Sequence, residues 1–288
     1  MQEFDFNSLS SQKNQAIRDF HDKGVIAVRG VPGFVEAYGN FIDSAQNFIN
    51  LTEEERTQYT PPDAYGRGWS YGLETFNNVT DAFKGSYYIT YPEEDAILPN
   101  IWPSNEVPDF KNNYLRLANI IFRTGKEILP LLGIHIEDVS SVGRMLYYGP
   151  THDPKSVEWC GEHRDHGLLT GLCPGVYFLK GQKVSRPLGT GLFIRGKEIF
   201  APDDALLFQI GEVAELITNG SVTATEHQVR KAVGGYERYG LALFISPRPD
   251  YVIESDLTKY KERFIPGMPY SEWNNRSYAK YYKDVEPL

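Results

Sequence analysis

The sequence contains only two cysteines in 288 residues, Cys160 and Cys173, and they form no C-x-x-C pair. Such a chain has no disulfide framework, so we exclude a small disulfide scaffold and expect a reducing compartment. The first residues lack the basic and apolar regions of a signal peptide, and no apolar run approaches the length of a membrane span. We therefore expect a cytoplasmic protein with no membrane partner.

Clusters of lysine and arginine are also missing, and the formal net charge is -9. Binding to a phosphate backbone needs clustered basic residues, so we expect no nucleic-acid partner. Hydrophobic residues make up 41% of the chain and aromatic residues 14%, which is typical of a globular protein with a large core. Composition leaves the oligomeric state open.

Hydrophobic periodicity divides the chain into a helical first part and a β-rich second part. Apolar stripes predict helices over residues 8–24, 34–50 and 108–131, and residues 61–75 have the composition of an ordered loop. From about residue 140, short β-type runs alternate with turn residues, and the tail after Pro249 returns to a helical pattern. The expected strands cover residues 25–28, 144–148, 168–172, 176–179, 191–194, 205–210, 223–229 and 239–245. No helical pattern separates the later strands, which favours a sandwich or barrel over a parallel sheet.

A candidate metal site begins with His163 and Asp165. On an extended backbone, residues i and i+2 point to the same side, so these two side chains are able to hold one ion together. His227, in a later β-type run, supplies a third ligand. Two histidines and one carboxylate form the facial triad whose open positions suit Fe(II) and dioxygen chemistry. Zinc accepts the same ligand types, so the residues alone leave the metal open.

These residues also have alternative interpretations. A chance His-x-Asp is plausible in a chain with six histidines and many aspartates. His166 is a rival ligand, but on a strand it would point away from the side that Asp165 faces.

Longer motifs around these residues resemble the isopenicillin N synthase-like branch of the Fe(II)/2-oxoglutarate dioxygenases. Residues 163–172, HRDHGLLTGL, are similar to the family's HTDxGLLTxL, and residues 211–220, GEVAELITNG, are similar to its GDxLxxxSNG. The second histidine follows in 225–229, TEHQV, and residues 237–244, ERYGLALF, align with the strand that carries the family's RxS motif. Residues 20–31 and 45–56 resemble its N-terminal region. The resemblance therefore covers most of the chain.

The resemblance implies an α+β, mainly β fold: a double-stranded β-helix, or jelly roll, flanked by N-terminal and C-terminal helices. It divides the chain into a helical N-terminal region of the non-haem dioxygenase type (1–137), a jelly-roll core (138–250) and a C-terminal helical segment that packs on the core (251–288). We expect these segments to form one compact unit, with Fe(II) in the mouth of the roll.

The same resemblance assigns a co-substrate site to Arg238. In the family, an arginine at this place pairs with the far carboxylate of 2-oxoglutarate, and a planar guanidinium suits that role because it offers two parallel N–H donors. Tyr148 retains a phenol that is able to support it. Two departures weaken the match: the serine of RxS is Gly240 here, and the asparagine of the family's NxY stretch is Leu146.

Three residues of the loop are candidates for the substrate mouth: Arg67, Trp69 and Tyr71. Aromatic loop residues more often simply hold a loop in place, and a solvated Arg67 is an equally ordinary reading.

The leading functional hypothesis is a 2-oxoglutarate-dependent oxygenase that hydroxylates, desaturates or cyclises a small molecule with O₂ through a ferryl intermediate. A second hypothesis is an Fe(II) oxidase of the same fold that uses no 2-oxoglutarate and binds a substrate carboxylate at Arg238. A third is a jelly-roll binding protein without turnover.

Overall fold

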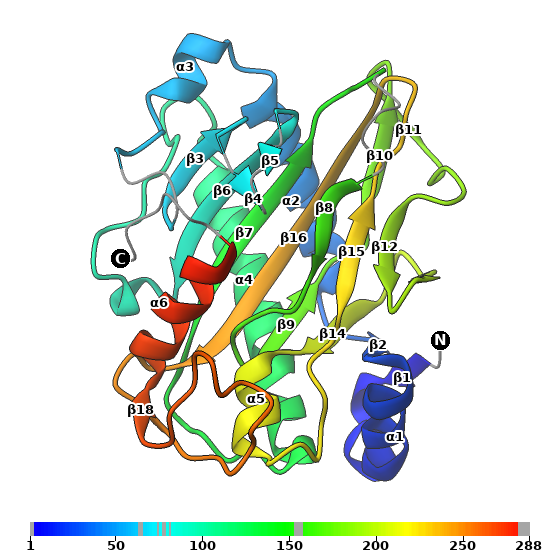
Figure 1. Ribbon diagram of the computed structural model, residues 1–288. Helices are drawn as coiled ribbons and strands as arrows, with labels where there is room; N and C mark the ends of the chain where they lie inside the picture. The colour runs from blue at the N-terminus through cyan, green and yellow to red at the C-terminus, as the bar shows by residue number, and fades with distance from the viewer. Residues whose placement is uncertain are drawn as a thin grey trace.

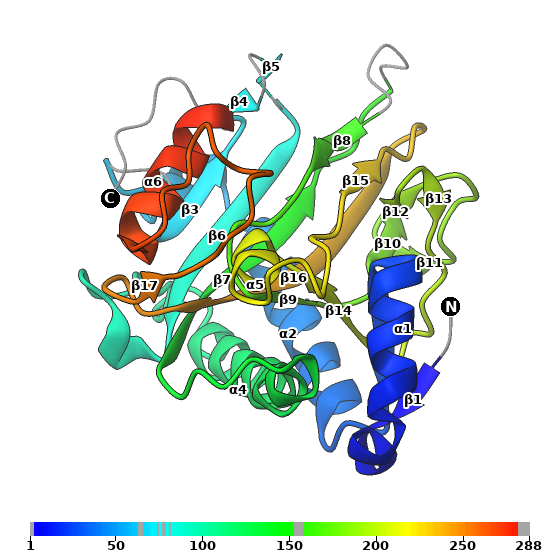
Figure 2. The ribbon, with the colours of Figure 1, turned by 60° about the horizontal axis from the view of Figure 1, so that its bottom comes forward.

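Two β-sheets face each other, and helices cover the outer face of the larger sheet (Figures 1 and 2). The computed structural model describes residues 3–62, 66–73, 75–76, 79–80, 82–152 and 158–281. The strand order in the larger sheet is β1-β2-β14-β9-β16-β7-β6-β3, with β10 paired to β16 and β11 paired to β10. The smaller sheet has the order β13-β12-β15-β8. Nearly all neighbouring strands run antiparallel; β1 and β2 are parallel. This arrangement agrees with the expected jelly roll.

The helices are α1 (Lys13–Lys23), α2 (Phe34–Ile49), α3 (Glu53–Thr57), α4 (Phe110–Ile128), α5 (Glu212–Ile217) and α6 (Tyr270–Tyr281). The first strands are β1 (Glu3–Asp5), β2 (Val25–Arg29), β3 (Gly68–Tyr71), β4 (Thr75–Phe76), β5 (Val79–Thr80), β6 (Lys84–Tyr91), β7 (Val139–Tyr148), β8 (Glu158–His163) and β9 (Leu169–Leu172). The remaining strands are β10 (Val176–Leu179), β11 (Gln182–Val184), β12 (Gly191–Ile194), β13 (Lys197–Glu198), β14 (Leu206–Ile210), β15 (His227–Arg230), β16 (Tyr236–Pro247), β17 (Val252–Ile253) and β18 (Met268–Pro269).

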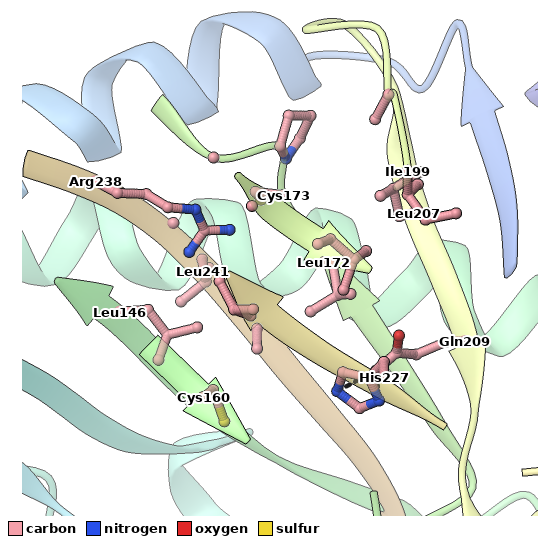
Figure 3. A pocket seen from close by; sticks show the side chains of 18 of the residues that line it. Leu146, Cys160, Leu172, Cys173, Ile199, Leu207, Gln209, His227, Arg238 and Leu241 are labelled. Carbon is pink, nitrogen blue, oxygen red and sulfur yellow. Dashed lines mark hydrogen bonds between the residues drawn. The ribbon is translucent and has the colours of Figure 1, made fainter. Parts of the chain in front are cut away.

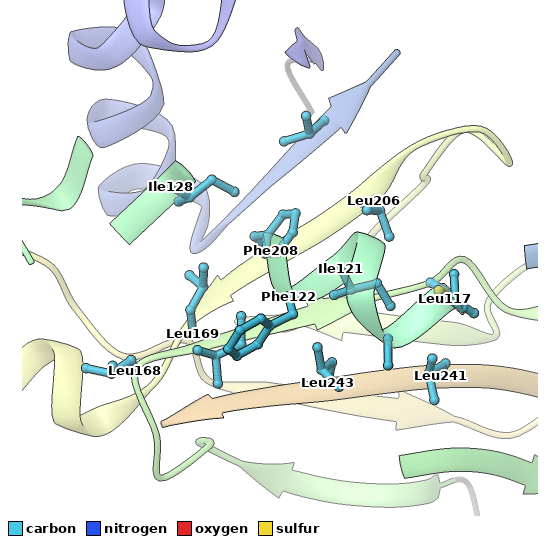
Figure 4. Packing of buried hydrophobic residues seen from close by; sticks show 14 of the residues in the cluster. Leu117, Ile121, Phe122, Ile128, Leu168, Leu169, Leu206, Phe208, Leu241 and Leu243 are labelled. Atoms are coloured by element: carbon cyan, nitrogen blue, oxygen red, sulfur yellow. The ribbon is translucent and has the colours of Figure 1, made fainter. Parts of the chain in front are cut away.

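The main core lies between the outer face of the larger sheet and helices α2 and α4. Figure 4 shows the part of it that α4 forms. Because side chains alternate along a strand, β9 and β14 direct Leu169 and Phe208 toward α4, while Thr170 and Gln209 face the opposite way, toward the smaller sheet. Ile121 and Phe122 of α4 pack on these strands in Figure 4. The helices thus bury one face of the sheet and leave the other free to form a site.

The first 137 residues supply strands as well as helices. β2 and β6 pair with β14 and β7, so this segment builds part of the larger sheet instead of only covering it. The sequence pattern missed β6, since the run from Lys84 to Tyr91 lies between turn-rich segments with few aliphatic residues. It also overestimated the helical tail, because α6 is preceded by loops and by the short β17–β18 pair. The boundaries at residues 137 and 250 remain predictions.

The C-terminal segment is tied to the rest of the molecule through buried polar contacts. Arg263 makes two parallel hydrogen bonds to Glu212 of α5, at 2.8 and 2.7 Å, and a third to Ser277 of α6. Trp273 is fully buried, and its indole N–H donates to the backbone carbonyl of His166 at 3.1 Å. Helix α6 therefore contacts the turn that follows β8. This helix lies on the opposite side of the larger sheet from α4 (Figures 1 and 2). In the part of the chain that the structure describes, no helix is long and apolar enough to cross a lipid bilayer.

Close packing of α4 on the sheet depends on a glycine in β9. A Cβ atom at Gly171 would lie 2.2 Å from Cγ2 of Ile121 and 3.1 Å from a ring carbon of Phe208. Gly171→Ala should therefore lower the free energy of unfolding by about 1–3 kcal/mol, the range typical of overpacked cores. The matched control is Gly39→Ala in α2, where a Cβ meets nothing within 4 Å; it should raise stability by about 0.5–1 kcal/mol because alanine favours helix. Urea denaturation measures both, and equal effects of the two variants would contradict the packing argument.

Candidate metal centre

The two histidines lie directly opposite each other on neighbouring strands of the smaller sheet. His163 is the last residue of β8 and His227 the first of β15, and their Cα atoms are register partners. Their ring centroids are 4.2 Å apart. Asp165 lies in the turn after β8, where its backbone carbonyl accepts a hydrogen bond from the N–H of Glu212 at 2.8 Å. The ligand atoms of all three side chains lie within 4.8 Å of one another.

Each imidazole ring is oriented by a hydrogen bond to the backbone carbonyl two residues before it. Nδ1 of His163 lies 2.8 Å from the carbonyl oxygen of Gly161, and Nδ1 of His227 lies 3.1 Å from that of Thr225. A carbonyl only accepts hydrogen bonds, so each Nδ1 carries a proton, and in the neutral imidazole each Nε2 presents a lone pair. Those Nε2 atoms lie 3.7 Å and 3.9 Å from Oδ1 of Asp165. The two rings therefore direct a nitrogen ligand toward the same carboxylate oxygen.

The carboxylate of Asp165 is held by its other oxygen. The Thr170 hydroxyl donates to Oδ2 at 2.6 Å, and the Gln209 amide donates to it at 2.8 Å. Thr170 and Gln209 are register partners on β9 and β14, and both are buried. Two donors on Oδ2 leave Oδ1 turned to the histidines, which favours one carboxylate oxygen as the ligand. Sequence spacing identified Asp165 through strand alternation, whereas these two hydrogen bonds from the larger sheet set its orientation.

The charges of the cluster suit a bound cation. Burial disfavours the ionised carboxylate, but His227, His163 and the two hydrogen-bond donors outweigh it and hold the pKa of Asp165 below its ordinary value. Burial and the neighbouring His163 lower the pKa of His227 to about 4. Burial also disfavours charge on His163, but the thiolate of Cys160 and the carboxylate of Asp165 raise its pKa to about 9. An ionised carboxylate and a neutral imidazole are the forms in which these groups bind metals, so a cation at this site replaces the proton of His163.

One cavity of about 260 Å³ joins the cluster to Arg238. Figure 3 shows Arg238, on β16, and His227 and Gln209 directed into this pocket, with Leu172 and Cys173 between them. Along β16 the next inward positions after Arg238 are Gly240 and Ala242, which line the same cavity. Small side chains at these positions leave room for a ligand that reaches from the cluster to the guanidinium.

Arg238 is buried and its hydrogen-bonding capacity is largely unused. The guanidinium lies 5.3 Å from the centroid of the Tyr148 ring, and its Nε and Nη1 atoms have no hydrogen-bond partner among the described residues. Burial disfavours its charge, while the surrounding phenols, above all Tyr177, raise its pKa above the ordinary value. A buried cation with free donors is costly unless an anion completes it, so this end of the cavity suits a carboxylate.

Residues 140–247, which include every residue of this cluster and Arg238, match the 2OG-Fe(II) oxygenase superfamily. The predicted resemblance is confirmed, and the match contains the strands that carry His163, His227 and Arg238. Curated relatives of this chain include the oxoglutarate-dependent flavonoid 7-O-demethylase 1 of Ocimum basilicum, 24% identical over 83% of this chain. A 2-oxoglutarate-Fe(II) type oxidoreductase of Aspergillus fumigatus is 23% identical over 85% of this chain and 79% of its own length. The chain spans 64% of the basil protein.

Solved structures confirm the jelly-roll fold of this chain. A full-length Neurospora crassa protein solved in complex with alpha-KG superposes with a TM-score of 0.74, covering 96% of this chain and 95% of that one at 20% sequence identity. A 2OG-Fe(II) oxygenase family protein from Caulobacter crescentus gives the same TM-score at 20% identity, covering 97% of this chain and 99% of that one. The likeness extends over the N-terminal and C-terminal helices as well as the sheets.

The three residues predicted for the substrate mouth, Arg67, Trp69 and Tyr71, are not among the described residues that line the cavity with the cluster. Trp69 is buried in the main core with its ring 5.2 Å from that of Phe48, and Tyr71 stacks on Trp69. Arg67 donates to the carbonyl of Pro99 at 3.5 Å. The sequence predicts a loop here because the run is rich in glycine. The structure instead contains the short strand β3, which places Trp69 against the helices.

Thr170 should strengthen metal binding through its hydrogen bond to Asp165. Thr170→Val keeps the shape of the side chain but leaves Oδ2 with one donor fewer, so the affinity for Co(II) or Fe(II) should fall by about tenfold, as for other partners of metal ligands. Thr170→Ser retains the hydroxyl and should bind the metal as the wild type does. Anaerobic titration calorimetry measures the affinities. Equal metal affinity in the valine and serine variants would contradict the role of the hydroxyl.

Proposed function

We propose that the protein is a non-haem Fe(II)- and 2-oxoglutarate-dependent oxygenase that hydroxylates, desaturates or cyclises a small-molecule substrate with O₂. The observation that carries the proposal is a single cavity with two opposed ends. One end offers two Nε2 atoms and Oδ1 of Asp165 to a cation, and the other offers the free donors of Arg238 to a carboxylate.

His163, Asp165 and His227 would hold Fe(II), and Arg238, supported by the ring of Tyr148, would hold the far carboxylate of 2-oxoglutarate. Iron with this co-substrate supplies the oxidising power for attack on an unactivated C–H bond, and O₂ then yields oxidised product, succinate and CO₂. The chain's own contribution is position and exclusion. Thr170 and Gln209 fix the carboxylate ligand, while Leu146, Leu172 and other apolar side chains of the cavity keep water from the reacting groups.

Two further predictions from the sequence belong to this proposal. A cytoplasmic location is supported by Cys160 and Cys173, which are both free thiols. The absence of a nucleic-acid partner is supported by the net charge of -9.

The proposed activity is tested by anaerobic loading with Fe(II), followed by oxygen uptake with and without 2-oxoglutarate. Oxygen uptake and succinate release should both require 2-oxoglutarate. His227→Ala should lose most bound iron and both signals, because two ligands of one ion bind far more weakly than three. Full iron occupancy in His227→Ala would overturn the ligand assignment, and His166 would become the alternative. A wild type that binds metal but takes up no oxygen with any candidate substrate would favour a binding protein.

The second candidate is an Fe(II) oxidase that takes all its electrons from the substrate and uses Arg238 to bind a substrate carboxylate. Gly240 and Leu146 favour it, because each replaces a polar residue of the 2-oxoglutarate motif. Product formation without succinate would identify this activity.

Arg238→Gln separates the role of this residue from that of the metal ligands. Loss of the buried charge should weaken the binding of 2-oxoglutarate by about 2–4 kcal/mol, which is the cost of truncating other buried charge pairs. Bound Fe(II) should be unchanged, since Arg238 lies at the opposite end of the cavity from the three ligands. The measurement is the dissociation constant of 2-oxoglutarate for the anaerobic Fe(II)-loaded protein, and an unaltered value would refute the assignment.

A further inference from the structure

Arg238 is flanked by a tyrosine on each side within one row of the larger sheet. The register pairs Arg238 of β16 with Tyr148 of β7 and with Tyr177 of β10. Residues paired in this way share a face and lie about 5 Å apart at Cβ. All three side chains line the cavity. No local sequence pattern marks Tyr177, because its place beside Arg238 arises from pairing between strands that are distant along the chain.

Tyr177 presents a buried hydroxyl whose proton has no acceptor among the described residues. The side chain is 2% exposed, and within the described residues its oxygen has no hydrogen-bond partner. A buried phenol normally finds one, and leaving it unpaired costs about 1–3 kcal/mol. The Nε and Nη1 atoms of Arg238 are in the same condition. Unpaired donors that gather in one corner of one cavity indicate a ligand that accepts several hydrogen bonds and carries negative charge.

We propose that Tyr177 donates its hydroxyl to the far carboxylate of 2-oxoglutarate and so takes the place of the serine that this chain lacks at Gly240. The inference rests on the proposed function and identifies a binding residue for its co-substrate. Arg238 provides the charge and two N–H donors. Tyr177 provides a neutral donor from the strand on the other side of the guanidinium from Tyr148, instead of from β16 itself.

Glycines around this corner make the room that such an arrangement needs. A Cβ at Gly175 would lie 2.4 Å from Nε of Arg238, and a Cβ at Gly191 of β12 would lie 2.8 Å from the Tyr177 hydroxyl. Any side chain at either position would therefore displace one of the donors. The phenol therefore reaches from the larger sheet to the backbone of the smaller one.

Gly240 leaves open space where the family has serine. A Cβ there would approach Nη1 of Arg238 to 3.9 Å and a carbonyl oxygen of Cys173 to 4.0 Å, which are ordinary contacts. A serine at this position is thus sterically compatible and would bring a hydroxyl beside the guanidinium. The chain is able to accept either source of the neutral donor, which makes the proposal testable by exchanging one for the other.

The experiment measures anaerobic binding of 2-oxoglutarate to the Fe(II)-loaded protein by calorimetry, in the wild type and in Tyr177→Phe. Loss of one neutral hydrogen bond should raise the dissociation constant by about 3- to 10-fold, with the Fe(II) content unchanged. The matched control is Tyr239→Phe, the same change at the neighbouring residue of Arg238 on the opposite face of the sheet. The dissociation constant of 2-oxoglutarate for Tyr239→Phe should equal that for the wild type.

Two further arms isolate the hydroxyl and the carboxylate. Adding Gly240→Ser to Tyr177→Phe should restore affinity to within about twofold of the wild type. With 2-oxobutyrate, which lacks the far carboxylate, wild type and Tyr177→Phe should bind equally. An unchanged affinity for 2-oxoglutarate in Tyr177→Phe, or an equal loss for both ligands, would overturn the proposal.

The outcomes also separate this proposal from the proposed function. A wild type that binds Fe(II) but no 2-oxoglutarate would reject the proposed co-substrate itself. A wild type that binds 2-oxoglutarate and loses it in Arg238→Gln, but not in Tyr177→Phe, would reject only the role of Tyr177.

Discussion

The buried carboxylate of Asp165 is the constraint on which the rest of the site depends. An ionised carboxylate in an apolar interior is stable only when hydrogen bonds and opposite charge surround it. Thr170 and Gln209 satisfy one oxygen, and both come from the larger sheet, whereas the two histidines come from the smaller one. The cluster therefore forms only when the two sheets lie at the correct separation. Helix α4 packs on the outer face of β9 and β14, the strands that carry Thr170 and Gln209 on their inner face.

Because side chains alternate along the strands, the two faces of the larger sheet have different roles. Its outer face is apolar and packs on helices, while its inner face carries polar groups that line the cavity. The groups at the two ends of the cavity differ in character: the metal ligands suit a cation, and Arg238 suits an anion. Binding at these two fixed points orients whatever lies between them, which is the role a protein plays when a cofactor supplies the reactivity.

Much of this arrangement is predictable from sequence, and the limits have physical causes. His163, Asp165 and His227 are identifiable because metal ligands are a restricted set of residue types, and Arg238 because its motif has a fixed order along the chain. The expected strands over 176–179 and 191–194 match β10 and β12, since each is a short apolar run between turns. Thr170 belongs to a motif that the sequence shows, but its role depends on a partner oxygen that only the fold reveals. Gln209 and Tyr177 escape prediction, as pairing between distant strands leaves no local pattern. Trp69, expected in a loop, lies in the core.

The contact between Trp273 and His166 joins residues that are 107 positions apart. During synthesis the ligands of the cluster leave the ribosome well before α6 does, so the turn that carries Asp165 first exists without the helix that holds its backbone. The residues of both sheets have already been synthesised at that stage. The hydrogen bond from Trp273 to His166 is therefore among the last contacts with the metal-binding turn that the growing chain is able to make.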